Sequence, residues 1–140
     1  MSSLTDDWGT PSEFFAALHH EFGFTLDVAA SATNAKCDRY FSIEDDGLAQ
    51  PWAPETCWMN PPYGRSIPAW VAKAWHESTL GATVVGLLPA RTDTAWWHDY
   101  VLKAGELRFV RGRLRFNGIA KDAPFPSAVA IWRMTSPRLR

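Results

Sequence analysis

The segment Asn60 to Tyr63, with the sequence NPPY, holds the side chains of this chain that are best suited to chemistry. Asn60 offers an amide oxygen and Pro61 a carbonyl without an N–H. The consecutive prolines, Pro61 and Pro62, stiffen the backbone, so both acceptors and the Tyr63 ring have fixed directions. Two such acceptors can bind both N–H bonds of a planar amino group and direct its lone pair at an electrophile. A stiff turn after a strand is the alternative interpretation.

The exocyclic amine of adenine fits this chemistry, because its lone pair is delocalised into the ring and it is a poor nucleophile until it is positioned. In a duplex the base must leave the stack, and stacking on Tyr63 would offset that cost. No general base is required, since an amine that has bonded to an electrophile becomes acidic and can lose its proton to water. RNA bases and glutamine amides in proteins pose the same problem, so both stay open as alternative acceptors.

The helices and strands that position this segment are predicted from alternating helical and extended patterns in the sequence. Helical spacing predicts helices over residues 10–22, 67–80 and 93–105, the first with Thr10 as N-cap and Pro11 in its first turn. Extended runs cover 24–30, 56–59, 82–89, 106–110, 114–116 and 127–132, with 106–110 and 114–116 as a hairpin. Such alternation predicts a three-layer α/β domain with a largely parallel sheet. Ligands then bind where strands 24–30 and 56–59 end.

Composition predicts one compact domain without a membrane span. The chain has 140 residues, of which 46% are hydrophobic, and it has no apolar run of the roughly 20 residues that a span needs. Its first ten residues lack the pattern of a signal peptide, so we expect a cytoplasmic location. Cys37 and Cys57 form no CxxC pair, and the four histidines lack the spacing of a zinc site. We therefore expect free thiols and no metal.

Charge is distributed unevenly along the chain. Up to Asn60 there are ten acidic and two basic residues, a net charge of −8, whereas from Pro61 onward twelve basic and five acidic residues give +7. The basic residues concentrate in RFVRGRLRF and the terminal PRLR. Such a concentration favours binding of a polyanion, and a solvated charged surface is the alternative.

Motifs along nearly the whole chain resemble those of the phage and prophage Dam-type DNA N6-adenine methyltransferases. They are DWGTPSEFF, LDVAAS, NAKC, DDGL, WMNPPYGR, LLPARTDTAWWHDYV, GRLRF and APFPSAV. The resemblance implies a site-specific enzyme of the bacterial host cytoplasm that transfers methyl from S-adenosylmethionine to N6 of a flipped-out adenine in double- or single-stranded DNA. It also implies a compact Rossmann-like methyltransferase fold, mostly parallel, with a C-terminal antiparallel hairpin. The oligomeric state stays open.

The resemblance also implies roles for individual residues. Asn60, Pro61, Pro62 and Tyr63 would be catalytic. Asp27 would lie near the cofactor's ammonium group, with a turn aspartate as the alternative, and Asp46 rather than Asp45 would lie near its adenosine. The full cofactor set is Trp8, Thr10, Pro11, Asp27, Ala29, Asp46 and Asn60. The nucleic-acid set is Arg65, Arg91, Arg113, Arg115 and Phe125. The alternatives are a surface ion pair for Arg91, a solvated surface for Arg113 and Arg115, and a hairpin core for Phe125.

Two features depart from the broader methyltransferase pattern. The cofactor loop AASATNA contains small residues but no glycine, which predicts a wider loop and weaker cofactor binding. We also expect residues 1–140 to form a single reduced methyltransferase domain, without a separate target-recognition domain. The acidic N-terminal half and the missing glycines leave a further alternative, a non-catalytic module that binds the cofactor or a DNA-processing enzyme, although a pure binder has no need for the paired acceptors of NPPY.

Overall fold

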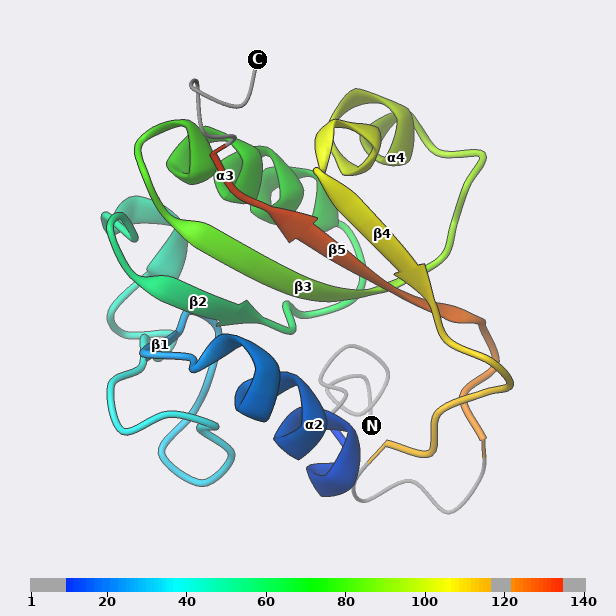
Figure 1. Cartoon of the computed structure of the whole chain (residues 1–140), viewed down its shortest axis with the longest axis horizontal. Helices are drawn as coiled ribbons and strands as arrows, with labels where there is room; N and C mark the ends of the chain where they lie inside the picture. The colour runs from blue at the N-terminus through cyan, green and yellow to red at the C-terminus, as the bar shows by residue number, and fades with distance from the viewer. Residues whose placement is uncertain (1–9, 117–121, 135–140) are drawn as a thin grey trace.

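A five-stranded mixed sheet organises the fold of this protein (Figure 1). The computed structural model describes residues 10–116 and 122–134. In the order in which they lie side by side, the strands are β1 (Leu26–Asp27), β2 (Thr56–Met59), β3 (Thr83–Pro89), β5 (Ser127–Trp132) and β4 (Glu106–Phe109). The pairs β1/β2 and β2/β3 are parallel, whereas β3/β5 and β5/β4 are antiparallel. The α/β class is confirmed, but the sheet is not mostly parallel.

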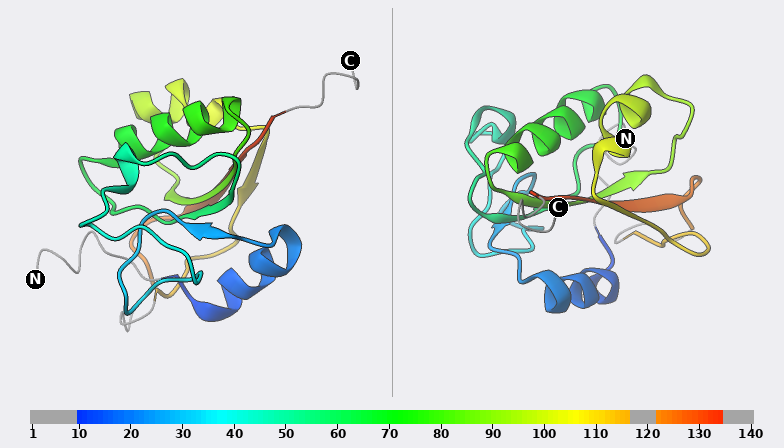
Figure 2. Two further views of the ribbon diagram at one scale, coloured as in Figure 1. Left: turned by 90° about the vertical axis from the view of Figure 1, so that its left-hand side faces the viewer. Right: turned by 45° about the horizontal axis from the view of Figure 1, so that its top comes forward.

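Helices cover both faces of this sheet (Figure 2). On one face lies α2 (Ser12–Phe22), and on the other lie α3 (Ile67–Thr79) and α4 (Ala95–Asp99). Two short 3₁₀ helices, η1 (Gly47–Ala49) and η2 (Val101–Lys103), complete the regular structure of the described residues. Because both faces are covered, all six residues of β5 are buried, as are the last six of β3. This explains the continuous apolar runs of these two strands.

The helices form where apolar spacing and end signals agree. In α3 the residues Ile67, Trp70, Val71 and Ala74 follow one face and are all buried. Helix α2 ends at Gly23, whose left-handed backbone (φ 67°) lets its N–H donate to the carbonyl of His19.

The N-terminal end of α2 differs from the prediction. Pro11 takes the N-cap position of this helix, and there is no side-chain capping bond. Thr10 is therefore not its cap. The Thr10 hydroxyl binds elsewhere, at the site described below.

The predicted hairpin between 106–110 and 114–116 is wrong. Residues 114–116 are not a strand, and β4 pairs instead with β5. The reason is non-local: β5 is buried along its whole length between β3 and β4, whereas Phe116 packs in an aromatic cluster.

The predicted helix 93–105 is split into two pieces. Helix α4 is capped by Thr94, whose Oγ1 accepts from the N–H of Trp97, and it ends before Tyr100, where the backbone turns to φ −128°. Helix η2 follows. The predicted strand 24–30 is likewise shortened to β1.

The described residues contain no helix that is both long and apolar enough to cross a membrane. Within ranges 10–116 and 122–134, no three His, Cys, Asp or Glu side chains gather in a way that could hold a metal ion. Cys37 and Cys57 are both free thiols, and burial raises their pKa values to about 11 and about 12.

Candidate active site

A pocket of about 460 Å³ lies where the chain leaves β1 and β2. The loop after β1 forms one wall, the segment before η1 forms a second, and the segment from β2 to α3 forms a third. The described residues that line it are Val28, Ala29, Ala30, Ser31, Asn34, Phe41, Ser42, Ile43, Asp46, Gly47, Asn60, Pro62, Ser66 and Trp70. The pocket thus lies at the carboxyl ends of the parallel strands, as the sequence predicts for a ligand site.

Asp27 organises the loop that follows β1. Its side chain is buried, and its Oδ1 accepts from the Ala29 N–H at 3.2 Å while Oδ2 accepts from the Lys36 N–H at 2.9 Å. Burial raises the pKa of Asp27 to about 6, although these two bonds and the Lys36 charge oppose the shift. Asp27 is not among the described residues that line the pocket. Its observed role is to hold both ends of the loop, and its contact with an ammonium group stays a prediction.

The loop after β1 has no need of glycine. Among the described residues, positive φ angles occur at Asp46 and at glycines outside this loop. Residues 28–36 therefore keep ordinary backbone angles, and Ala29, Ala30 and Ser31 lie against the pocket. Side-chain acceptors close the turn, including Asn34 Oδ1, which accepts from the Ser31 N–H at 2.7 Å.

The two acidic residues before η1 have different roles. Asp45 accepts from both the N–H and the hydroxyl of Ser42, at 2.9 and 3.0 Å, and these bonds lower its pKa. Asp46 lines the pocket in a left-handed conformation with φ 56°. The next residue must be glycine, because a Cβ on Gly47 would lie 2.3 Å from the carbonyl oxygen of Val28. The structure thus favours Asp46 over Asp45 as the pocket carboxylate.

Asn60 lies on the wall of the pocket, directly after β2. Its Nδ2 donates to Oγ1 of Thr10 at 2.9 Å, a contact between residues 50 positions apart. Thr10 is 1% exposed, and neither it nor Pro11 is among the described lining residues, so Thr10 supports Asn60 from behind. Pro62 lines the pocket and Pro61 is buried beside it. Trp8, also predicted to bind cofactor, lies outside the described residues.

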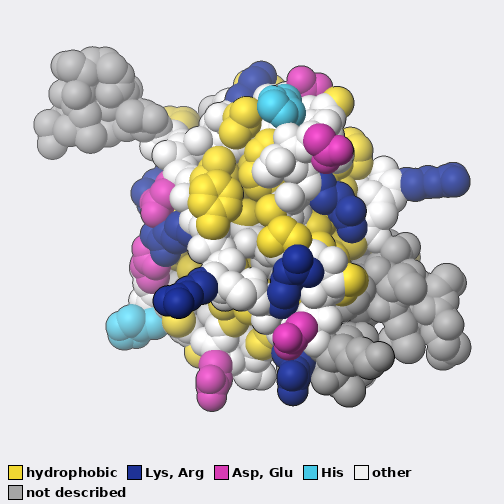
Figure 3. All heavy atoms as spheres, turned by 90° about the vertical axis from the view of Figure 1, so that its right-hand side faces the viewer, with side chains coloured by type: hydrophobic (Ala, Val, Ile, Leu, Met, Phe, Trp, Pro, Cys, Tyr) yellow, Lys and Arg dark blue, Asp and Glu magenta, His cyan; other side chains and the backbone are white. Residues whose placement is uncertain are grey.

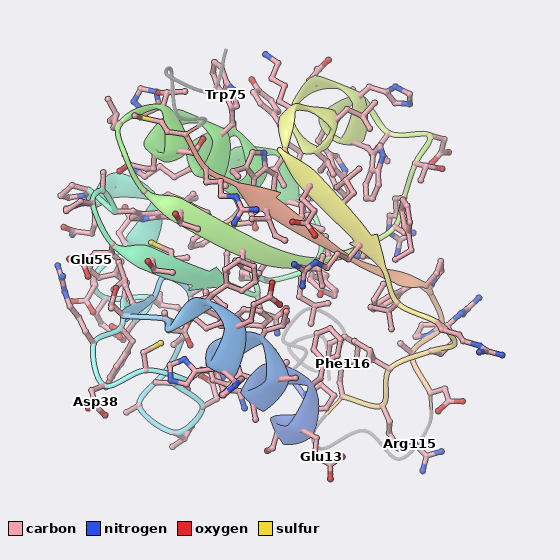
Figure 4. All side chains as sticks on the ribbon, in the orientation of Figure 1. Glu13, Asp38, Glu55, Trp75, Arg115 and Phe116 are labelled. Carbon is pink, nitrogen blue, oxygen red and sulfur yellow. The ribbon has the colours of Figure 1, made fainter. Side chains whose placement is uncertain are left out.

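Tyr63 belongs to a buried aromatic cluster with Phe116 and Phe125. Its hydroxyl donates to the carbonyl of Leu87 at 2.9 Å, and burial raises its pKa. The Phe125 and Phe116 rings meet it edge-on, at centroid distances of 5.5 and 6.3 Å. Figure 4 shows Phe116 turned toward the interior. Tyr63 is only 5% exposed, and its stacking on a flipped base stays a prediction.

The predicted nucleic-acid arginines are all exposed, and three of them lie around this cluster. Arg91 lies over the Phe125 ring at 5.9 Å, and Arg113 donates to the carbonyl of Ala123 at 3.3 Å. Arg115 points outward and pairs with Asp122 at 3.4 Å (Figure 4). Arg65 follows the NPPYG segment.

The surface on the β4 side of the molecule is of mixed character. Figure 3 shows basic side chains spread around an apolar area, with acidic ones among them. Phe125 is buried, and its position beside a flipped base stays a prediction.

Sequence reasoning missed much of the pocket lining. Phe41, Ser42 and Ile43 lie in an irregular segment without periodicity, and only their position before DDGL could have indicated them. Trp70 lies on the buried face of α3, stacked on Trp52 at 6.1 Å, and it also borders the pocket.

Comparison with known proteins identifies the family. A family model described as DNA N-6-adenine-methyltransferase (Dam) matches residues 1–134. The DNA N-6-adenine-methyltransferase of Escherichia phage T1 is 33% identical over 114 residues, which are 80% of this chain and 48% of the phage protein. That of Haemophilus phage HP1 is 34% identical over 108 residues, 75% of this chain and 62% of the relative.

A shorter relative matches part of the chain. The putative methyltransferase YfdM of Escherichia coli K12 is 34% identical over 70 residues, 45% of this chain and 77% of the relative. The chain spans 48% and 62% of the lengths of the two phage relatives. With the match of the family model over residues 1–134, these similarities show that the chain belongs to the Dam family of DNA N-6-adenine-methyltransferases.

Proposed function

We propose that this protein transfers the methyl group of S-adenosylmethionine to N6 of adenine in DNA, on a base flipped out of the stack. The observation that carries the proposal is the amide of Asn60, which follows β2 on the wall of a pocket of about 460 Å³ and is hydrogen-bonded by Thr10. The names of the two phage relatives support adenine and DNA as the substrate. The domain would be a single reduced methyltransferase unit of the Rossmann-like type.

The pocket suits S-adenosylmethionine in size and chemistry. Its volume falls within the range of small-ligand sites. Trp70 and Phe41 offer apolar surface for a purine, and the Asp46 carboxylate can accept from ribose hydroxyls. Ala29 and Ala30 leave room for the ligand to approach the backbone. When bound, the cofactor supplies a methyl group on a sulfonium that leaves as a neutral thioether.

The chain's own residues would position the acceptor. The Asn60 oxygen and the Pro61 carbonyl would accept the two N–H bonds of adenine N6, so that the nitrogen lone pair points at the methyl carbon. As the N–C bond forms, the nitrogen gains positive charge, which these two acceptors stabilise until one of its protons passes to water. Arg65, Arg91, Arg113 and Arg115 would contact phosphates, and Phe125 would lie beside the base.

Labelled methyl transfer tests this proposal. Purified protein is incubated with isotope-labelled S-adenosylmethionine and mixed-sequence DNA, and the digested nucleosides are examined by mass spectrometry. We expect labelled N6-methyladenine, and we expect Asn60→Ala to reduce its rate ~100-fold or more with cofactor affinity nearly unchanged. Label in RNA or in protein glutamine, with none in DNA, would overturn the assignment of the substrate.

Asn34→Ala is the matched control, because Asn34 also lines the pocket but bonds the backbone of its own loop. It should weaken cofactor binding, as measured by calorimetry, and leave the rate at saturating cofactor within about threefold of the unmodified protein. If Asn60→Ala instead weakens cofactor binding as much as it lowers the rate, Asn60 is a cofactor residue.

A further inference from the structure

We propose that Thr10 is a positioning residue for the reaction, which holds the Asn60 amide in the plane that the acceptor nitrogen requires. The inference rests on the proposed function and extends it to a residue outside NPPY and outside the pocket wall. It starts from the hydrogen bond of 2.9 Å from Asn60 Nδ2 to Thr10 Oγ1.

Asn60 needs such a partner because of its own torsions. The prolines that follow it fix the backbone, but the terminal torsion of an asparagine is broad and is not held in one rotamer. A freely turning amide would present its NH₂ group to the adenine amine for part of the time, and two donors would then face each other. The bond to Thr10 engages the NH₂ end of the amide and so fixes the orientation of the amide plane.

Thr10 is well placed to act as a rigid support. It is 1% exposed and directly precedes Pro11, whose φ of −58° is fixed by its ring. The Pro11 carbonyl accepts from the N–H of Phe15 at 3.0 Å, and the Phe15 ring is buried against Trp58 of β2 at 5.2 Å. The Thr10 hydroxyl is thus attached to a helix that packs on the same strand that delivers Asn60.

Two substitutions separate the hydroxyl from the rest of the side chain. Thr10→Val keeps the shape and removes the hydrogen bond, whereas Thr10→Ser keeps the hydroxyl. We expect Thr10→Val to lower kcat about 10- to 100-fold, while the cofactor Kd and the KM for DNA change by less than about threefold. Thr10→Ser should retain most of the activity. Thr79→Val, at an exposed helix end, controls for the exchange of threonine for valine in general.

Two outcomes of these activity measurements would overturn the inference. Equal losses in Thr10→Val and Thr10→Ser would overturn the role of the hydroxyl. A weaker cofactor Kd with unchanged kcat would make Thr10 a cofactor residue and would equally overturn the inference. If the unmodified protein does not methylate adenine, the proposed function fails, and the contact must be judged by a measurement that needs no turnover.

Nuclear magnetic resonance of protein labelled with ¹⁵N-asparagine gives that measurement. The chain has only three asparagines, Asn34, Asn60 and Asn117, so Asn60→Asp identifies the Asn60 side-chain signal. One of its two NH₂ protons should exchange slowly in the unmodified protein and in Thr10→Ser, and quickly in Thr10→Val. Equal exchange in all three proteins would overturn the inference whether or not the protein is active.

Discussion

At the scale of single residues, Asp27 organises the loop after β1 through hydrogen bonds to backbone N–H groups. Its carboxylate binds the N–H groups of Ala29 and Lys36, so both ends of the loop are held by one side chain. Because Asp27 is 2% exposed, ionisation is costly, and its pKa rises from 3.8 to about 6. The hydrogen bonds that hold the loop are thus linked to the protonation state of the Asp27 carboxyl group.

This pKa gives a prediction with a definite sign. The folded protein binds the Asp27 proton more tightly than the unfolded chain does, so this group adds to the free energy of unfolding as the pH falls through about 6. Between pH 7 and pH 5 the unmodified protein should gain about 1 kcal/mol over Asp27→Asn. Urea unfolding of both proteins at the two pH values measures this difference. A difference that does not change with pH would show that Asp27 titrates normally.

At the scale of elements, helix α3 supports the pocket through Glu77. The Oε1 of Glu77 accepts from the N–H groups of Trp52 and Ala53, at 2.7 and 2.9 Å, and its Oε2 pairs with Lys73 at 3.0 Å. Trp52 in turn donates from Nε1 to the carbonyl of Gly47, on the pocket wall. Burial opposes the charge of Glu77, yet these bonds lower its pKa.

We therefore expect Glu77→Ala to cost about 2–4 kcal/mol in the free energy of unfolding, because two buried N–H groups lose their acceptor. Glu77→Gln should cost roughly half as much or less, since the amide oxygen can still accept from both and only the pair with Lys73 is lost. Chemical denaturation measures both variants. Equal costs would assign the effect to the charge rather than to the accepted bonds.

At the scale of the whole molecule, the acidic and basic segments of the chain lie in different regions of the fold. β4 and β1 lie at opposite edges of the sheet. The segment after β4 carries Arg111, Arg113 and Arg115, all exposed, whereas the acidic Asp45 and Asp46 lie in the segment between β1 and β2. If the basic segment holds DNA, its contribution should depend on salt.

Replacing Arg113 and Arg115 together by alanine should flatten the plot of log affinity for DNA against log salt by about 1–2 units, since each lost phosphate contact removes about 0.9. Fluorescence anisotropy over a range of salt concentrations measures the slope. The matched control is the pair Arg39→Ala and Arg133→Ala, which removes two surface arginines that pair with Glu55 and Glu106 instead. Equal slopes in both double variants would assign Arg113 and Arg115 to the solvated surface.

The sequence by itself determined the helices, strands and motifs that depend on residues close together in the chain. The helical spacing of apolar residues predicted α3, and continuous apolar runs predicted β3 and β5. The order of these patterns predicted the α/β class. Local motifs placed NPPY at a strand end and DDGL in a turn beside the expected ligand. The motifs that carry the family resemblance lie along nearly the whole chain, and the family model matches residues 1–134.

The tertiary structure alone decided which distant segments meet. The residue pattern of a buried apolar strand is the same whether its partner is parallel or antiparallel. Only the packed sheet therefore shows that β5 lies between β3 and β4. The bond between Thr10 and Asn60 joins residues 50 positions apart, and the burial of Tyr63 depends on Phe116 and Phe125, far along the chain. Such contacts are set by the competition of all apolar surfaces for one core, which no local pattern contains.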